Sequence, residues 1–240
     1  MSNPLEQFTV KKLIDLHAYG VDISFTNSSL LMVITALSII LLFAFTLKKR
    51  TIIPSLTQSV PEALYGFVYN LVKANVGKNG LKYISFIFCL FLFVAFGNLL
   101  GLFPYSFTFT SHIAAVGALS LLALCFNIIV GFKNRKWGYF RTFLPNGIPF
   151  ALAPLVVPIE MISLLSKPFS LTVRLVANMT VGHIMLKILG GFVVALGLAG
   201  AVPLTFDALI IIFEMFIAVL QAFIYTVLSC IYLSDALRSH

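Results

Sequence analysis

The stretch ISFIFCLFLFVAFGNLLGLFPYSFTFTS, residues 84–111, is 28 residues long and carries no formal charge. A helix rises about 1.5 Å per residue and the hydrocarbon core of a bilayer is about 30 Å thick, so this run is long enough to cross a membrane as a helix. Its apolar residues follow one another without the two-residue alternation of a membrane β-barrel strand. The stretch therefore predicts a membrane-spanning helix.

The rest of the chain has the same character. Of its 240 residues, 60% are hydrophobic and only 10% are charged, and the mean hydropathy is +1.04, far above the range of a soluble domain. Four more uncharged stretches have about the length of a span: residues 23–47, 113–132, 188–206 and 215–234. We expect an all-α membrane protein with about five transmembrane helices, of which the last two are long, tilted and kinked by proline.

The basic residues are concentrated in two loops rather than spread over a surface. Cationic loops between spans are typical of the cytoplasmic side of a membrane, so the net charge of +8 requires no nucleic-acid partner. Within the first loop, residues 61–76 form a short amphipathic stretch, which predicts an interfacial helix. Ten of the sixteen lysines and arginines lie in the two loops: Lys48, Lys49, Arg50, Lys73, Lys78, Lys82, Lys133, Arg135, Lys136 and Arg141.

The sequence changes near residue 140. Residues 1–140 hold ordinary spans and basic loops, whereas residues 141–240 carry prolines and polar groups inside apolar segments, which predicts a functional helical hairpin. No repeat or long linker separates the two parts, so we expect one integral membrane domain over residues 1–240. The three cysteines lack CxxC spacing and are expected to be small core residues, and no Walker-type phosphate loop is present. The sequence therefore predicts no metal site, no cofactor and no catalytic site of its own.

Polar residues recur at helical spacing in the hairpin. At about 100° per residue, Arg174 shares one helix face with five residues that step by three or four positions. His183, nine residues past Arg174, points the opposite way. The five residues on the Arg174 face are Glu160, Ser163, Lys167, Ser170 and Asn178, and a second line in the last segment comprises Asp207, Glu214, Gln221 and Tyr225.

Each of these residues also has a purely structural interpretation. Hydroxyl and amide groups commonly hold membrane helices together, and a single histidine is often a packing residue. That interpretation is weakest for Arg174, Glu160 and Glu214, because a charge at the membrane centre costs about 3 kcal/mol. Three such residues in two segments indicate an ion or proton route.

Two motifs in the hairpin carry a resemblance to a known family. SLTVRLVANMTVGHIMLK, residues 170–187, and EMFIAVLQAFIYTVLSCIYLSDA, residues 214–236, resemble subunit a of F-type ATP synthases. The resemblance extends upstream to FGNLLGLFPYSFT and to NPLEQF near the N-terminus. The pairing of His183 with Glu214 is similar to the mitochondrial and alphaproteobacterial branch. Gly101 departs from the family pattern, because some members carry an aspartate there.

The resemblance implies a proton-translocating stator subunit of the Fo sector, which provides two proton half-channels to a rotor ring and couples proton flow to rotation and ATP synthesis. It implies that Arg174 faces the rotor carboxylate as an essential cation. The implied partners are the hairpin subunits of the ring, the peripheral-stalk subunit b, other ATP synthase subunits and the lipid of an energy-transducing inner membrane. The implied proton pathway comprises His183, Glu214 and Gln221 on the outer side, Glu160 and Ser170 on the inner side, and Asn178.

Two functions from other classes also suit an apolar helical chain. A self-contained proton-coupled transporter would form a substrate pocket between repeats, and the absence of an internal repeat counts against it. A structural subunit of a respiratory complex would have no proton route of its own. The lines of charge through Arg174, Glu160 and Glu214 count against that alternative.

Overall fold

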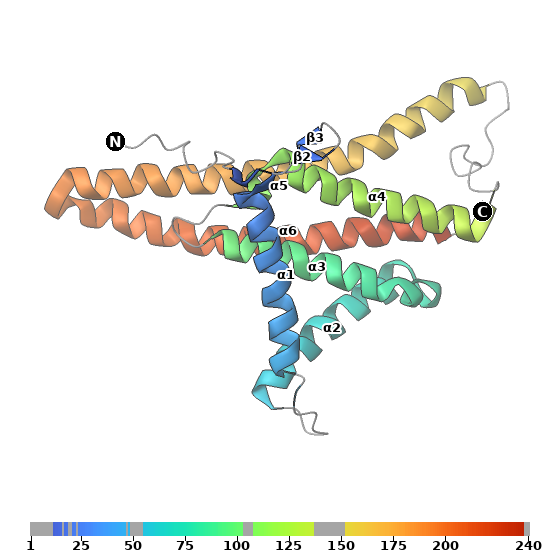
Figure 1. Ribbon diagram of the computed structural model, residues 1–240, viewed down its shortest axis with the longest axis horizontal. Coiled ribbons are helices and arrows are strands. Elements are labelled where there is room, and N and C mark those ends of the chain that lie inside the picture. Colours follow the sequence, from blue (N-terminus) through green and yellow to red (C-terminus); the bar gives the residue numbers. More distant parts are fainter. Residues whose placement is uncertain are drawn as a thin grey trace. The chain divides into compact units, whose positions relative to one another are not determined.

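The structure is a computed structural model that describes residues 12–15, 17–18, 21–22, 24–46, 48, 55–102, 108–136 and 152–237. Nearly all of this part is helical (Figure 1). Five helices are long and apolar enough to cross a membrane, which confirms the predicted fold class. They are α1 (Asn27–Thr46), α3 (Ile84–Gly101), α4 (Ile113–Arg135), α5 (Ala153–Leu196) and α6 (Ala201–Leu237), while α2 (Leu56–Asn75) is the amphipathic helix.

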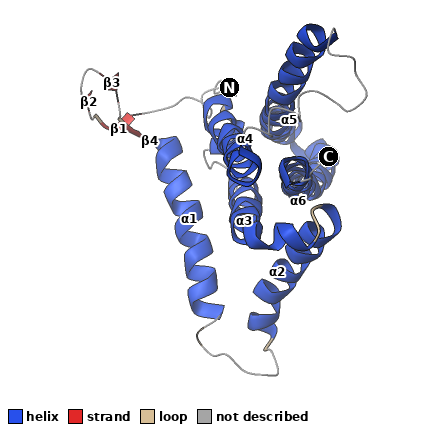
Figure 2. Ribbon diagram, turned by 90° about the vertical axis from the view of Figure 1, so that its right-hand side faces the viewer, coloured by secondary structure: helices blue, strands red, loops and turns tan. Residues whose placement is uncertain are grey.

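Short non-helical elements flank these helices. Ahead of α1, two antiparallel pairs form, β1 with β4 and β2 with β3 (Figure 2). Three 3₁₀ turns, η2, η3 and η6, precede α3, α4 and α6. The bounds are β1 Lys12–Ile14, β2 His17–Ala18, β3 Val21–Asp22, β4 Phe25–Thr26, η2 Lys78–Tyr83, η3 Phe109–Ser111 and η6 Gly197–Gly200.

Two predicted spans differ from the helices observed. The quoted stretch ends at Ser111, but α3 ends at Gly101, ahead of Pro104, and the residue before a proline disfavours helical backbone. The run over residues 188–206 is not a span, because it contains the turn between α5 and α6. Gly197 in that turn has a φ of 56°, which favours glycine.

Helix α5 is the longest element, with 44 residues, and α6 has 37, which confirms that the last two spans are the longest. Pro158 and Pro168 lie inside α5. Each lacks the amide hydrogen that would bond the carbonyl four residues earlier, which favours bending there. In the turn that follows Pro168, the Oγ1 of Thr172 donates to the Pro168 carbonyl at 2.8 Å.

Helix α2 begins five residues before the predicted start at Pro61. The Oγ of Ser55 accepts a hydrogen bond from the amide of Gln58 at 3.4 Å, and this N-cap starts the helix upstream of the proline. Val68 and Val72 are fully buried, whereas Tyr65 is exposed, as expected of an amphipathic helix.

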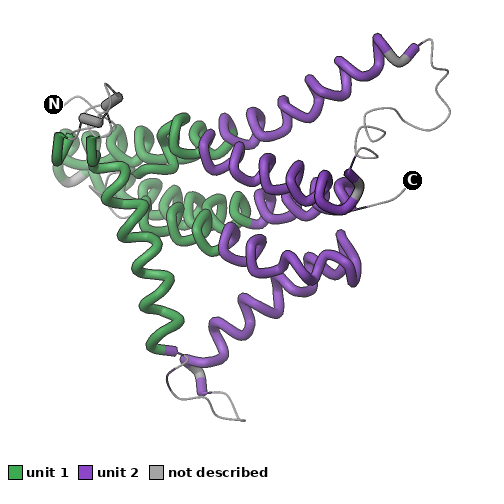
Figure 3. Tube along the Cα trace, turned by 45° about the vertical axis from the view of Figure 1, so that its right-hand side comes forward, with its two compact units in different colours: residues 1–45, 92–116, 174–222 green, residues 46–91, 117–173, 223–240 purple. Residues whose placement is uncertain are grey.

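The chain divides into two compact units (Figure 3). Unit 1 comprises residues 1–45, 92–116 and 174–222, and unit 2 comprises residues 46–91, 117–173 and 223–240. The predicted change near residue 140 lies outside the described residues.

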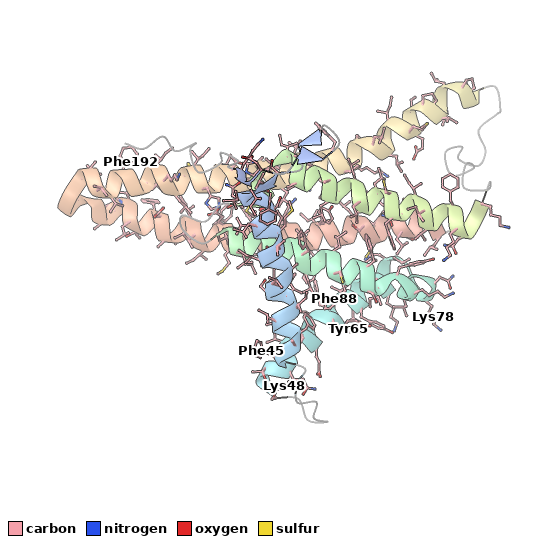
Figure 4. All side chains as sticks on the ribbon, viewed as in Figure 1. Phe45, Lys48, Tyr65, Lys78, Phe88 and Phe192 are labelled. Atoms are coloured by element: carbon pink, nitrogen blue, oxygen red, sulfur yellow. The ribbon has the colours of Figure 1, made fainter. Side chains whose placement is uncertain are left out.

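Unit 2 is held by aromatic and hydroxyl contacts. The rings of Phe86 and Phe126 stack with centroids 3.7 Å apart. Tyr65 meets Phe88 edge to face at 5.4 Å, and both rings are labelled in Figure 4. The hydroxyls of Ser120 and Thr172 hydrogen-bond at 2.9 Å, which joins α4 to α5 through groups that are both satisfied.

In unit 1, the end of α5 and the start of α6 run antiparallel on either side of η6 (Figure 1). Leu175 and Met179 of α5 are fully buried, but many large apolar side chains are exposed, including Phe192 at 53% (Figure 4). Exposed apolar surface of this kind suits a lipid or subunit environment.

The cysteine prediction is only partly correct. Cys230 is buried, as expected of a small core residue, but Cys89 and Cys125 are exposed. Both exposed residues lie on lengthy apolar helices, α3 and α4, where a small apolar side chain can face lipid as readily as a core.

Candidate functional site

Four segments of unit 1 bring buried polar side chains together: the end of α3, the η3 turn, α5 and α6. His183 and Glu214 are each 4% exposed, and Gln221 and Asn98 are fully buried. Glu214, Ala218 and Gln221 are all buried, and their spacing of four and three residues places them on one face of α6. The predicted polar line of α6 therefore faces the protein interior at these positions.

The η3 turn fixes Thr108 in this region. The carbonyl of Thr108 accepts two hydrogen bonds from Ser111, one from its amide at 3.2 Å and one from its Oγ at 2.6 Å. The neighbouring Phe109 packs over Gly97 and against the Phe93 ring, with ring centroids 5.6 Å apart. These contacts hold the Thr108 side chain, which is 1% exposed, at the end of α3.

His183 is joined to this turn by a hydrogen bond. Its Nε2 lies 2.9 Å from the Oγ1 of Thr108, which also donates to the carbonyl of Gly101 at 3.0 Å. The backbone of Gly101 is a further hydrogen-bond partner of His183.

A second histidine, His112, follows η3, and burial lowers its pKa from the ordinary value of 6.5, so it is largely neutral near pH 7.

Glu214 packs directly on the backbone of α5. A Cβ added to Gly182 would overlap Oε1 of Glu214 and would lie only 2.6 Å from its Cδ. Only glycine at position 182 leaves room for this carboxyl, which therefore lies beside the residue preceding His183. One turn further along α6, the carbonyl of Ala218 accepts a hydrogen bond from Nδ2 of Asn98 at 3.2 Å. The two contacts tie α6 to α5 and α3.

Several buried polar atoms in unit 1 have no hydrogen-bond partner among the residues that the structure describes. Buried polar atoms are usually paired, and leaving one unpaired costs about 1–3 kcal/mol. A cluster of them on an apolar background is a site that water or a transferred proton can serve. The atoms are both carboxyl oxygens of Glu214, both amide atoms of Gln221, Oδ1 of Asn98, Oγ1 of Thr110 and Oδ1 of Asp207.

The other predicted residues lie outside this cluster. Arg174 and Ser170 are exposed, while Asn178 and Glu160 are partly buried. Within the described part of the chain, the Arg174 side chain forms no hydrogen bond or ion pair. The same part contains no group of three or more histidine, cysteine, aspartate or glutamate residues arranged to hold a metal ion.

Sequence reasoning missed Thr108, Asn98 and Gly182. Thr108 and Asn98 are polar residues of the largely apolar motif FGNLLGLFPYSFT, and this polarity could have indicated them. Their partners, however, are distant in sequence. The departure at Gly101 also has a structural account, because a Cβ there would lie 2.5 Å from Cγ2 of Thr108. Thr108 therefore occupies the space that an aspartate side chain at position 101 would need.

Comparisons with known proteins identify the family of the chain. The chain matches the family described as ATP synthase A chain over residues 29–234. It is 52% identical to ATP synthase subunit a of Rhodospirillum rubrum and 47% identical to that of Paramagnetospirillum magneticum, with 100% of both chains covered in each comparison. It is 44% identical to ATP synthase subunit a of Pelagibacter ubique, with 100% of this chain and 99% of the relative covered. The chain therefore belongs to the ATP synthase A chain family.

Proposed function

We propose that this chain provides two proton half-channels to the rotor ring of the ATP synthase and so couples proton flow to rotation and ATP synthesis. Membership of the family makes it an inner-membrane subunit of the Fo sector, with other ATP synthase subunits as partners. The ring of hairpin subunits and the peripheral-stalk subunit b are the partners that we propose specifically. The buried Glu214 carboxyl is the observation that carries the proposal.

Glu214 is a carboxyl group in an apolar surrounding, seated on Gly182 beside His183. A purely structural carboxyl would be expected to have a hydrogen-bond or charge partner, because an unpaired one destabilises the fold. Neither oxygen of Glu214 has such a partner among the described residues. Histidine and carboxyl groups both gain and lose protons readily, so His183, Glu214 and Gln221 suit the route by which protons reach the ring from outside.

Arg174 is exposed, whereas Glu214 is buried, and we propose a different role for it. Its side chain is exposed, and an arginine guanidinium in a protein is a permanent cation. We assign it to the rotor carboxylate, which it draws into the ionised form, and to the barrier that separates the two half-channels. We also assign Asn178, which lies one turn along the same helix, to the pathway.

The inner half of the pathway is assigned to Glu160 and Ser170. Both lie on α5 at spacings that continue the Arg174 face toward the predicted side of the basic loops. Glu160→Gln keeps the volume and hydrogen-bonding groups of the side chain but removes its charge. It is expected to slow proton flux without disassembling the complex.

The function is tested with Glu214→Gln in ATP synthase reconstituted into lipid vesicles. ATP-driven proton pumping should fall about 100-fold, the size typical of losing an acid–base group, while ATP hydrolysis by the detached catalytic sector stays unchanged. Glu62→Gln is the matched control, because Glu62 is exposed on α2 and contacts only Gln58 among the hydrogen bonds observed. Pumping at the native rate by an assembled Glu214→Gln complex would overturn the assignment.

A further inference from the structure

We propose that Thr108 is a positioning residue that holds neutral His183 with its proton on Nε2, so that Nδ1 is the nitrogen that accepts and releases the translocated proton. The inference rests on the proposed role of His183 in the proton route. It concerns a residue on a different segment, 75 positions away in sequence, and it states which nitrogen of the histidine ring carries the proton.

The number of hydrogens available around Thr108 determines which atom donates in its bond to His183. A threonine hydroxyl has one proton to donate and two lone pairs that accept. The Gly101 carbonyl, 3.0 Å away, can only accept, so the hydroxyl proton is used there. Nε2 of His183, 2.9 Å from the same oxygen, must then be the donor of the second bond.

The opposite tautomer, with the proton on Nδ1, is less stable. If Nε2 lacked its proton, the Thr108 hydroxyl would have to turn toward it and give up its bond to Gly101. A buried carbonyl that loses such a bond is destabilised. The neutral ring therefore favours the tautomer in which Nε2 carries the hydrogen and Nδ1 is unprotonated.

Thr108 is fixed firmly enough to impose this choice. Its carbonyl is bound twice by Ser111, and the adjacent Phe109 is anchored over Gly97. The side chain is 1% exposed, so water has little access to compete for its hydroxyl. The site is preorganised, as expected for a group that orients a proton carrier.

The proton transfer that follows is simple to write. An arriving proton binds the lone pair of Nδ1 and gives an imidazolium with N–H groups at both nitrogens. The proton leaves from Nδ1 again, and the neutral ring with Nε2–H bound to Thr108 is restored. The bond between Nε2 and its hydrogen stays intact throughout the cycle, so Thr108 takes no part in the transfer itself.

The tautomer is measurable by solid-state ¹⁵N nuclear magnetic resonance. The full-length chain is labelled at its four histidines and reconstituted into lipid vesicles at a pH at which His183 is neutral, and the His183 signals are identified by subtracting the spectrum of His183→Gln. The wild-type chain should show a protonated Nε2 and an unprotonated Nδ1. Thr108→Val, which keeps the shape but removes the hydroxyl, should give a mixture of both tautomers, and Thr108→Ser should restore the wild-type spectrum. An Nδ1–H tautomer in the wild-type chain would overturn the proposal even if Thr108→Val fails to fold, and so would a Thr108→Val spectrum identical to the wild type.

Proton flux in the assembled ATP synthase gives the functional readout. Thr108→Val should lower ATP-driven pumping about tenfold, the size typical of losing a group that orients a functional histidine, and Thr108→Ser should retain most of it. Equal loss in both variants would indicate a packing role and contradict the proposal. If His183→Gln itself pumped normally, the proposed proton route would fail, while the tautomer spectrum would still report on Thr108 independently.

Discussion

Arg174 and His183 lie on the same helix, nine residues apart, and have opposite environments. Arg174 is exposed, and its side chain has no hydrogen bond or ion pair within the described part of the chain. His183 is buried and joined to Thr108 on another segment of the same unit. The periodicity of a helix accounts for the difference in direction, since nine residues correspond to two and a half turns.

The comparison shows how one helix can serve two partners. A permanent cation on an exposed face requires an anion from outside the chain, because a charge in lipid without one is costly. On the buried face, His183 can gain or lose a proton, and it is hydrogen-bonded by a side chain of the same chain, Thr108. Variants of the two faces should therefore fail in different ways.

The largest effect is expected on the exposed face, at Arg174. Arg174→Ala should lower proton-driven ATP synthesis at least about 100-fold, because it removes the cation that we propose as the electrostatic partner of the rotor carboxylate. It should also increase passive proton leak, because we propose that this cation is the barrier between the half-channels. Arg174→Lys should fail as well, with less leak, because an ammonium group can lose its proton in a dry site.

Synthesis and passive proton permeability are measured in the same vesicles for each Arg174 variant. A lysine variant that synthesises ATP at the native rate would contradict the requirement for a permanent, planar cation.

On the buried face, His183 and Glu214 are expected to act as a unit. The double variant of His183→Ala with Glu214→Ala should be impaired less than the sum of the two single variants, with a coupling of about 0.5–3 kcal/mol in the activation free energy of proton flux. Their proximity supports this expectation, since Glu214 packs on Gly182. As a control, His183→Ala is combined with Thr35→Ala, whose hydroxyl bonds only to Leu31 of its own helix among the bonds observed. Strict additivity of the His183 and Glu214 effects would show that the two residues act separately.

A smaller effect is expected where the two helices meet, at Gly182. Gly182→Ala forces a Cβ into the Glu214 carboxyl and should lower the stability of the subunit by about 1–3 kcal/mol, as overpacking does. Thermal unfolding in lipid vesicles measures this loss. Gly190→Ala on the same helix is the matched control, because a Cβ there meets no atom within 4 Å. The penalty at Gly182 should shrink when Glu214 is also changed to alanine, and an undiminished penalty would exclude the proposed clash.

The smallest effect is expected at a buried polar pair that is already satisfied. Ser120 bonds Thr172 at 2.9 Å in unit 2, and Ser120→Ala should cost only about 0.6 kcal/mol, the average for such bonds between membrane helices. Proton flux should remain at the wild-type rate, as measured in the same pumping assay. A large loss of flux would show that the satisfied pair belongs to the proton route as well.

The sequence was sufficient for the features that depend on local periodicity. The length of the uncharged stretches predicted α1, α3 and α4. The spacing of nine residues along a helix predicted that Arg174 and His183 would face opposite ways. Contacts across the fold could not be predicted in this manner. Thr108 binds His183 only because η3 folds back at the end of α3, and Gly182 matters only because α6 approaches α5 there. The turn inside residues 188–206 was missed because a membrane hairpin can close with apolar residues.

The isolation of α1 has a consequence for the biogenesis of the protein. Only Thr35 of its twenty residues is buried, and its mean hydropathy over a span-length window is 2.5. Membrane helices insert first as independently stable segments and associate afterwards. Helix α1 satisfies the insertion step by hydropathy alone and contributes little to the association step within this chain. It can therefore leave the translocon and anchor the nascent chain before α5 and α6 have been synthesised.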